Sequence, residues 1–120
     1  MNLTFNRQEF LHLGLIIAGF TETTIERINE KTNLERFRGR FYANPETCQD
    51  ILNGLQRPDI EDSYTKKPNP KYVLLALNYM KEYPKQGTLA GTFHITEKTA
   101  LKQAKTYVKK IQGLKKIKIV

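Results

Sequence analysis

The chain has 120 residues, enough for one domain with a hydrophobic core and too few for two domains of ordinary size. Its hydrophobic content of 39% lies above the disordered range, and its single cysteine excludes an intramolecular disulfide. The net charge of +8 is uneven, because residues 1–60 hold seven basic and eight acidic residues while residues 61–120 hold thirteen lysines and four acidic residues.

A basic excess confined to one half of a chain is typical of a protein that binds a polyanion. The alternative is a set of lysine-rich helices that only keep the chain soluble. The lone Cys48 fits a reducing compartment, and its apolar neighbours predict a core position. The longest apolar stretch, residues 10–20, is shorter than the roughly 20 residues that span a membrane. We therefore expect neither a membrane segment nor a signal peptide here.

Hydrophobic spacing in the first half predicts helices over residues 7–19 and 33–41, with a short helix between them that Thr21 caps and that runs to about residue 29. A further helix opens at Asn44-Pro45, an asparagine cap followed by proline at the first helical position. It runs to about residue 56. The residues expected in the core of this half are Phe10, Leu13, Ile17, Phe37, Phe41, Ile51 and Leu55.

Asn69-Pro70 repeats the asparagine-proline start and opens a helix that Pro84 closes. The sequence thus predicts an apolar helical lobe over 1–57, a linker over 58–68, a second lobe over 69–113 and a basic tail over 114–120. Apolar residues and lysines alternate in the tail, which suits a short strand or an extended arm. We expect an all-α fold of five or six helices, with at most this terminal strand.

The second lobe ends in a helix-turn-helix pattern. A short helix over 86–93 is followed by a turn at His94-Ile95, and a second helix starts after Thr96. Ala90 offers a small side chain where the helices cross, and His94 is expected to take the left-handed backbone conformation that such a turn needs. The inward stripe of the second helix is predicted to be Ala100, Ala104, Val108 and Ile111.

The outward face of the second helix carries side chains that can bind DNA. Lysine binds phosphates or base acceptors, threonine binds phosphate or packs on a thymine methyl group, and a glutamate can accept from a cytosine amine. The N–H groups at the start of the helix favour anions. The predicted DNA-binding residues are Lys85, Thr96, Glu97, Lys98, Thr99, Leu101, Lys102, Lys105 and Lys109.

The sequence holds no pattern typical of an active site. It has no zinc-type Cys/His spacing, no glycine-rich phosphate loop and no nucleophile motif. His12 lies in the apolar first helix, where a core or rim position is expected. We predict no enzyme activity, no metal site and no cofactor.

Residues 72–111 resemble the helix-turn-helix region of PIF/Harbinger-type DDE transposases and their domesticated relatives. The matching features are an apolar helix ending near Pro84, the pair Leu89-Ala90 and the segment Thr96-Glu97-Lys98-Thr99-Ala100. Upstream, residues 37–52 resemble the phenylalanine-rich segment and helix of the family. That match rests on Phe37, Phe41, Pro45, Cys48 and Ile51.

The resemblance implies DNA binding without nuclease activity, because the family's catalytic domain, with its three metal-binding carboxylates, would begin at about Val120. Gln103 departs from the pattern, which often has a large apolar residue there. We therefore expect a nuclear double-stranded DNA-binding module, derived from a transposase or acting as a subunit of a DNA-acting complex. The alternative is a protein-interaction or scaffold subunit that docks through its first lobe and whose helix-turn-helix no longer reads DNA. RNA binding ranks last, since no aromatic stacking platform is apparent.

Overall fold

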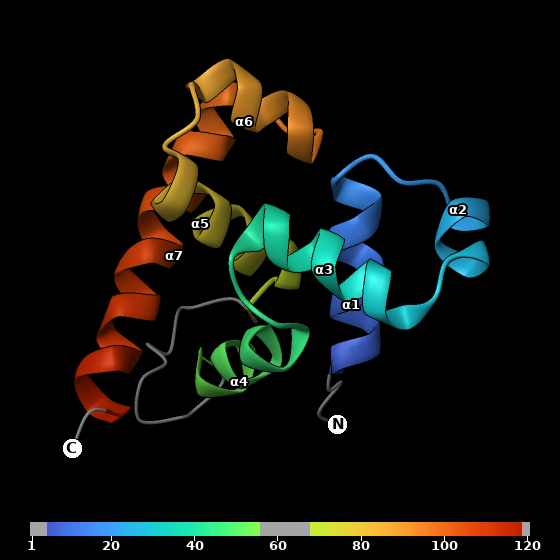
Figure 1. Cartoon of the computed structure of the whole chain (residues 1–120). Helices are drawn as coiled ribbons and strands as arrows, with labels where there is room; N and C mark the ends of the chain where they lie inside the picture. Colours follow the sequence, from blue (N-terminus) through green and yellow to red (C-terminus); the bar gives the residue numbers. More distant parts are fainter. Residues whose placement is uncertain (1–4, 56–67, 119–120) are drawn as a thin grey trace.

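The structure, a computed structural model, describes residues 5–55 and 68–118, with side chains of the second range described up to residue 113. These residues form seven α-helices and no strand, which confirms the all-α fold and gives one helix more than expected (Figure 1). The helices are α1 (Arg7–Ile17), α2 (Glu22–Arg27), α3 (Glu30–Phe41), α4 (Pro45–Leu55), α5 (Pro70–Glu82), α6 (Gln86–Phe93) and α7 (Glu97–Lys118).

Side-chain caps fix where the helices begin. Asn6 caps α1, because its side chain accepts from the Glu9 N–H at 2.9 Å while the Glu9 carboxylate accepts from the Asn6 N–H at 3.3 Å. Thr21 caps α2, as expected. Asn29 accepts from the N–H of Thr32 at 2.8 Å, so α3 begins three residues earlier than the predicted start at residue 33. Residue 29, predicted to end one helix, instead caps the next.

The basic tail departs from prediction. Residues 114–118 continue α7 as helix instead of forming a strand or arm, and residues 119–120 lie outside the described residues. Extending an existing helix is favourable for leucine and lysine, while starting a strand needs a partner strand. The spacing of three residues between Ile111, Leu114 and Ile117 also fits a helix.

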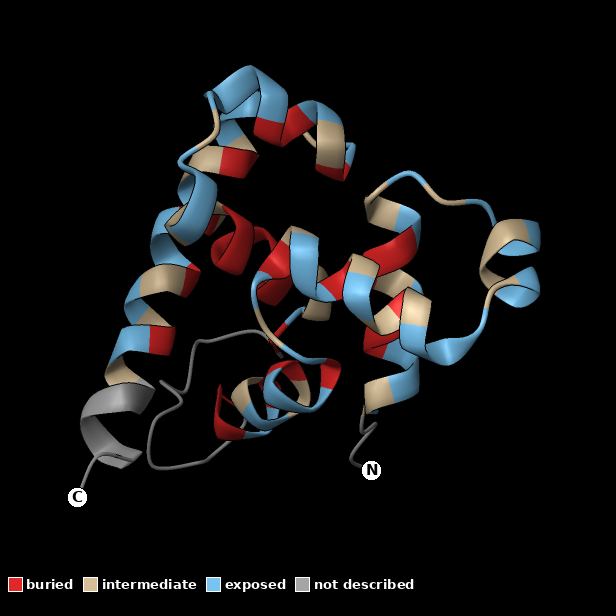
Figure 2. Cartoon of the chain, in the orientation of Figure 1, coloured by how far each residue is buried: buried red, intermediate tan, exposed pale blue. Residues whose placement is uncertain are grey.

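α5 occupies the centre of the fold and packs against α1, α3, α4, α6 and α7. Figure 2 shows that the helices around it carry buried residues. Six consecutive residues of α5, Val73 to Asn78, are buried. Buried side chains from both halves of the chain form one core cluster. The division into two lobes stays a prediction, and most of the predicted linker, residues 58–67, lies outside the described residues.

The predicted core of the first half is confirmed in part. Phe10, Phe37, Phe41 and Leu55 are buried, as is Cys48. The other three predicted residues are only partly buried, because α1 and α4 turn other side chains inward. These three are Leu13, Ile17 and Ile51.

Candidate nucleic-acid interface

α6 and α7 are packed together through a three-residue turn, with the boundaries predicted from the sequence. Ala90 is buried in the core, and Ile95 is partly buried against it. His94 takes the left-handed conformation, with φ 55° and ψ 47°, which confirms the prediction for this turn. Thr96 caps α7 by accepting from the Thr99 N–H at 3.2 Å. The helix pair is thus in place, while its use in DNA binding stays a prediction.

The buried side of α7 determines which side chains face outward. Ala100, Ala104, Tyr107 and Ile111 are buried. Tyr107 therefore takes the inward place predicted for Val108, which is only partly buried. The Tyr107 ring packs against Tyr72, and its hydroxyl accepts from the Asn69 N–H at 2.9 Å at the start of α5. Burial also raises the pKa of Tyr107 above its ordinary value.

Four exposed lysines form a single stripe on α7, which we call the lysine stripe: Lys98, Lys102, Lys105 and Lys109. At about 100° per residue they fall within an arc of about 60°, on the side opposite the buried residues. The stripe is about 16 Å long, because its ends are eleven residues apart and each residue rises about 1.5 Å. The ion pairs between described residues are Arg7–Glu30, Arg7–Glu46 and His12–Glu22, so none involves the stripe.

The N-termini of α6 and α7 adjoin. The side-chain amide of Gln86 donates to the Glu97 carbonyl at 3.0 Å, linking the first residues of the two helices. The Glu97 carboxylate turns toward α6, and its Oε1 lies 3.1 Å from the position of a Cβ on Gly87. Lys85 is exposed at the N-cap of α6, beside this junction. Two positive helix ends and a lysine therefore share one corner of the molecule.

Thr99 and Leu101 are less available than the sequence suggested. Both are half-buried, and the Thr99 hydroxyl lies 2.8 Å from that of Thr96, which is itself exposed.

Sequence reasoning missed Gln86, because nothing in its neighbourhood indicates a contact eleven residues away. Lys110 also lies off the stripe, with its ammonium 5.2 Å from the centre of the Tyr107 ring.

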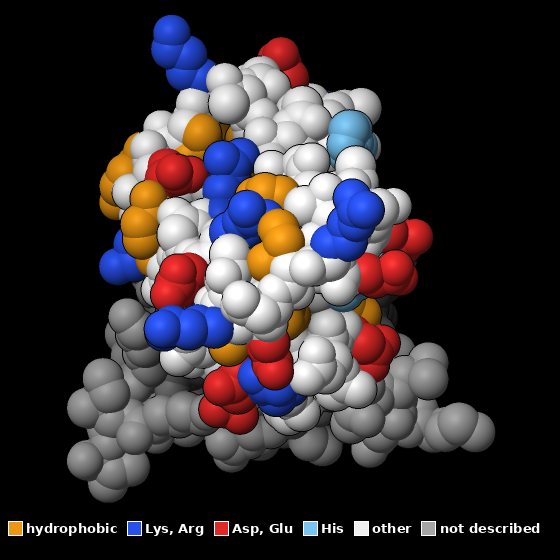
Figure 3. All heavy atoms as spheres, turned by 45° about the vertical axis from the view of Figure 1, so that its right-hand side comes forward, with side chains coloured by type: hydrophobic (Ala, Val, Ile, Leu, Met, Phe, Trp, Pro, Cys, Tyr) orange, Lys and Arg blue, Asp and Glu red, His pale blue; other side chains and the backbone are white. Residues whose placement is uncertain are grey.

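Charge separates the two parts of the described chain. Residues 68–113 carry eight lysines and two glutamates, a net of +6, whereas residues 5–55 carry six basic and seven acidic residues, a net of −1. Figure 3 shows the side formed by α1, α2 and α3, where basic and acidic side chains are interspersed. The uncompensated positive charge thus lies in the part that contains α6 and α7.

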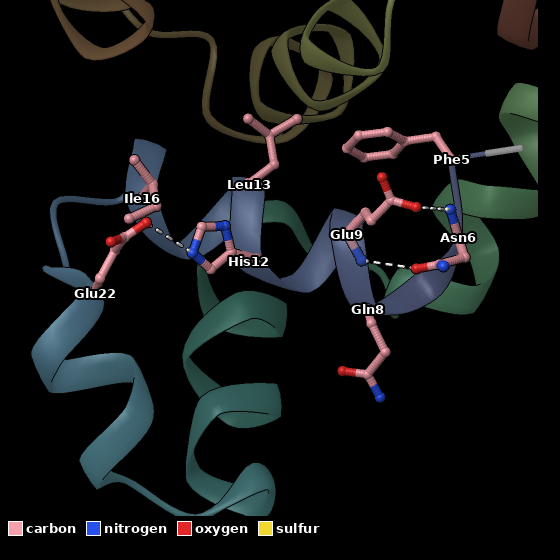
Figure 4. Close-up of a pocket in the computed structure, with 8 residues that line it drawn as sticks. All are labelled: Phe5, Asn6, Gln8, Glu9, His12, Leu13, Ile16 and Glu22. Carbon is pink, nitrogen blue, oxygen red and sulfur yellow. Dashed lines mark hydrogen bonds and ion pairs between the residues drawn. The ribbon is translucent and has the colours of Figure 1, made fainter. Parts of the chain in front are cut away.

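A second surface feature is a groove of about 570 Å³ over α1, which we call the α1 groove (Figure 4). Ile16, which is 38% exposed, and the partly buried Phe5 and Leu13 supply its apolar lining. His12 lies on its rim, 3.5 Å from Glu22, so the sequence prediction of a core or rim histidine is met at the rim.

Within residues 5–55 and 68–118, no three metal-ligating side chains gather into a group that could hold an ion. None of the helices described is long and apolar enough to cross a membrane.

Comparison of the chain with protein-family models, curated proteins and solved structures finds no match. The resemblance to PIF/Harbinger-type transposases therefore remains a prediction from residues of this chain alone.

Proposed function

We propose that this protein is a non-enzymatic, double-stranded DNA-binding module that acts through α6 and α7. The lysine stripe carries the proposal: four exposed ammonium groups lie in line, without a described carboxylate partner. Nonspecific affinity for DNA comes chiefly from lysines and arginines that neutralise phosphates.

The dimensions of α7 suggest how the stripe would be used. In helix-turn-helix proteins the N-terminal residues of the second helix contact base edges in the major groove. The groove is about 12 Å wide, and the stripe is longer than that. We therefore assign Lys98 and Lys102 to the groove and its edges, and Lys105 and Lys109 to phosphates beyond it.

The corner formed by the two helix N-termini supports a further set of contacts. Lys85 and the free N–H groups of α6 suit a backbone phosphate. Thr96 is exposed at the start of α7, where a hydroxyl can reach phosphate, and Leu101 can pack on a thymine methyl group. Thr99 is assigned to holding the cap more than to DNA. A nuclear location and descent from a transposase follow from the resemblance and are part of the same proposal.

The test is binding of the full chain to a labelled random-sequence duplex, measured by fluorescence anisotropy at two salt concentrations. The variant Lys98→Ala/Lys102→Ala/Lys105→Ala should lose affinity most at low salt. The slope of log affinity against log salt should flatten by about 0.9 for each DNA phosphate that the variant no longer neutralises. Its thermal midpoint should stay close to wild type, because the three side chains are exposed.

The matched control is Arg27→Ala/Lys31→Ala/Arg38→Ala. These three residues are also exposed and carry the same total charge, but they lie on α2 and α3. This control should keep most of the affinity. Equal losses of DNA affinity in both triple variants would mean that binding depends only on total charge. An unchanged DNA affinity in the lysine variant would mean that the DNA contact lies away from α7.

The α1 groove favours a second candidate function, docking on a protein partner. A helix that is apolar on nearly all sides is usually covered on all sides, yet Ile16 is left exposed. The two functions are compatible, because the groove and the lysine stripe lie on different helices. If the wild-type chain bound no duplex at low salt, docking on a protein partner would become the preferred function.

A further inference from the structure

A small cavity, wide open to solvent at the surface, lies between α3, the end of α1 and the end of α5, apart from the lysine stripe. Its volume is about 260 Å³. We call it the arginine cavity. Its lining residues are Ala18, Phe20, Arg36, Gly39, Arg40 and Glu82.

Each of the two arginines of the cavity has one buried nitrogen without an acceptor. The Arg36 guanidinium lies over the Phe20 ring, 4.5 Å from its centre, and its Nη1 is buried without a hydrogen-bond partner. Arg40 donates from Nη2 to the Thr92 hydroxyl at 3.5 Å, a long contact, while its Nε is buried and unpartnered. Each guanidinium has five N–H donors. A buried donor without an acceptor is destabilising, and more so when it belongs to a charged group.

Glu82 lines the same cavity but forms no ion pair with either arginine. One of its carboxylate oxygens accepts from the Tyr42 hydroxyl at 3.4 Å, and the other accepts from the buried side-chain amide of Asn78. No ion pair between described residues includes Arg36, Arg40 or Glu82. The carboxylate is thus held by neutral donors, and it is the one anionic group among the lining residues of a cavity that holds two guanidinium groups.

The residues of α3 that line the cavity are unfavourable for helix stability, which points to a role in binding. Arg36 and Arg40 are four residues apart on one helix, so their like charges repel. Gly39 lies between them in the last turn of α3, and glycine in a helix is less favourable than alanine. Packing does not require this glycine, because a Cβ built there has no neighbouring atom within 4 Å. The absent side chain of Gly39 leaves open space beside Arg36 and Arg40.

We propose that the arginine cavity binds a phosphate group. Two guanidinium charges match a phosphate, which carries close to two negative charges at neutral pH, better than they match a single carboxylate. The planar donor forks of arginine also suit the geometry of phosphate oxygens. The cavity exceeds the roughly 30 Å³ share of one water molecule several-fold, so it has room for free phosphate or for a small phosphate ester.

The experiment follows the arginine side-chain Nε–Hε signals of the ¹⁵N-labelled full chain by NMR. Inorganic phosphate should shift the Arg36 and Arg40 signals in a saturable way, while acetate at equal ionic strength should not. Glycerol 3-phosphate is the second probe. Tighter binding of the ester identifies an organic phosphate as the ligand, and equal binding identifies free phosphate.

Arg40→Gln should weaken phosphate binding about tenfold or more, as expected for loss of a charged hydrogen-bond donor. Arg38→Gln is the matched control, since it removes the same charge from an exposed position of the same helix and should leave the affinity unchanged. Glu82→Gln should strengthen binding. The Lys98→Ala/Lys102→Ala/Lys105→Ala variant should keep the arginine shifts, which separates this site from the proposed DNA contact.

Gly39→Leu tests the site without removing a charge, because its side chain enters open space and should block the cavity while the fold is kept. Loss of the saturable shift in this folded variant supports the proposal. The proposal is overturned if the wild-type protein shows no saturable shift at either arginine, or if affinity survives in Gly39→Leu.

Discussion

Gly14 and Gly39 both lie inside helices, but packing needs only the first. A Cβ on Gly14 would lie 2.3 and 2.6 Å from ring atoms of Phe37 and 2.8 Å from Phe41, closer than real Cβ contacts come. α1 and α3 therefore approach each other through the missing side chain of Gly14. At Gly39 the same addition meets nothing within 4 Å.

We expect Gly14→Ala to lower the free energy of unfolding by about 1–3 kcal/mol, the usual cost of overpacking a core. Gly39→Ala should raise it by about 0.5–1 kcal/mol, the difference between alanine and glycine inside a helix. Urea denaturation followed by circular dichroism measures both. Equal effects of the two substitutions would contradict the close approach of α1 to α3.

Cys48 is a core residue, as predicted, and burial raises the pKa of its thiol from 9.0 to about 12. A buried neutral thiol stabilises the fold below pH 9, and this contribution is lost as the pH rises from about 9 toward 12. At pH 8 the thiolate fraction should be about a thousandfold smaller than in the unfolded chain, as three pKa units imply.

Labelling of Cys48 with an aromatic disulfide reagent at pH 8 should therefore be slow in native protein and fast in urea. The unfolded chain is the control, because its thiol has the ordinary pKa. Equally fast labelling in both states would show an accessible thiolate and contradict the buried position.

At the scale of one element, the orientation of α1 about its own axis determines how strongly each substitution in it destabilises the protein. Leu15 is fully buried, whereas Leu13 lies in the α1 groove and is only partly buried. The sequence alone predicted a core position for Leu13. We expect Leu15→Ala to cost about 2–5 kcal/mol and Leu13→Ala clearly less, both from urea denaturation. If Leu13→Ala destabilised the protein more than Leu15→Ala, the face of α1 that carries Leu15 would not be the one packed against the core.

Glu97 is the acidic first residue of α7, in the corner shared with α6. Glu97→Gln should raise affinity for random-sequence duplex at low salt about 1.5- to fivefold, the value of one exposed charge pair. It should also lower stability by about 0.3–1 kcal/mol, because the helix N-terminus favours an acid. Glu35→Gln removes the same charge from α3 and should leave affinity nearly unchanged. Reduced duplex binding by Glu97→Gln would indicate that the carboxylate contacts DNA directly.

At the scale of the whole molecule, the charge is divided between two parts of the chain while the core is shared. α5 packs against helices of both parts, and the buried side chains form one cluster. We expect a single unfolding transition, with the same midpoint by calorimetry and by circular dichroism. Two separated transitions would instead indicate two folding units, as the sequence division into 1–57 and 69–113 suggests.

Local interactions made several features predictable from sequence. The asparagine-proline starts of α4 and α5, the left-handed conformation of His94 and the boundaries of α6 depend on groups within a few residues. The spacing of the lysine stripe is likewise fixed once α7 is a helix. Such features follow from backbone geometry and capping, which neighbouring residues decide.

Only the tertiary structure decided which of several apolar residues turn inward and which polar groups meet. Tyr107 rather than Val108 is buried on the inward stripe, where its hydroxyl meets the N–H group of Asn69, thirty-eight residues away. The Gln86–Glu97 contact and the arginine cavity also join residues whose local sequence contains no sign of the other. The physical reason is that packing energy depends on the matching of surfaces from distant segments, and only the folded chain brings those surfaces together.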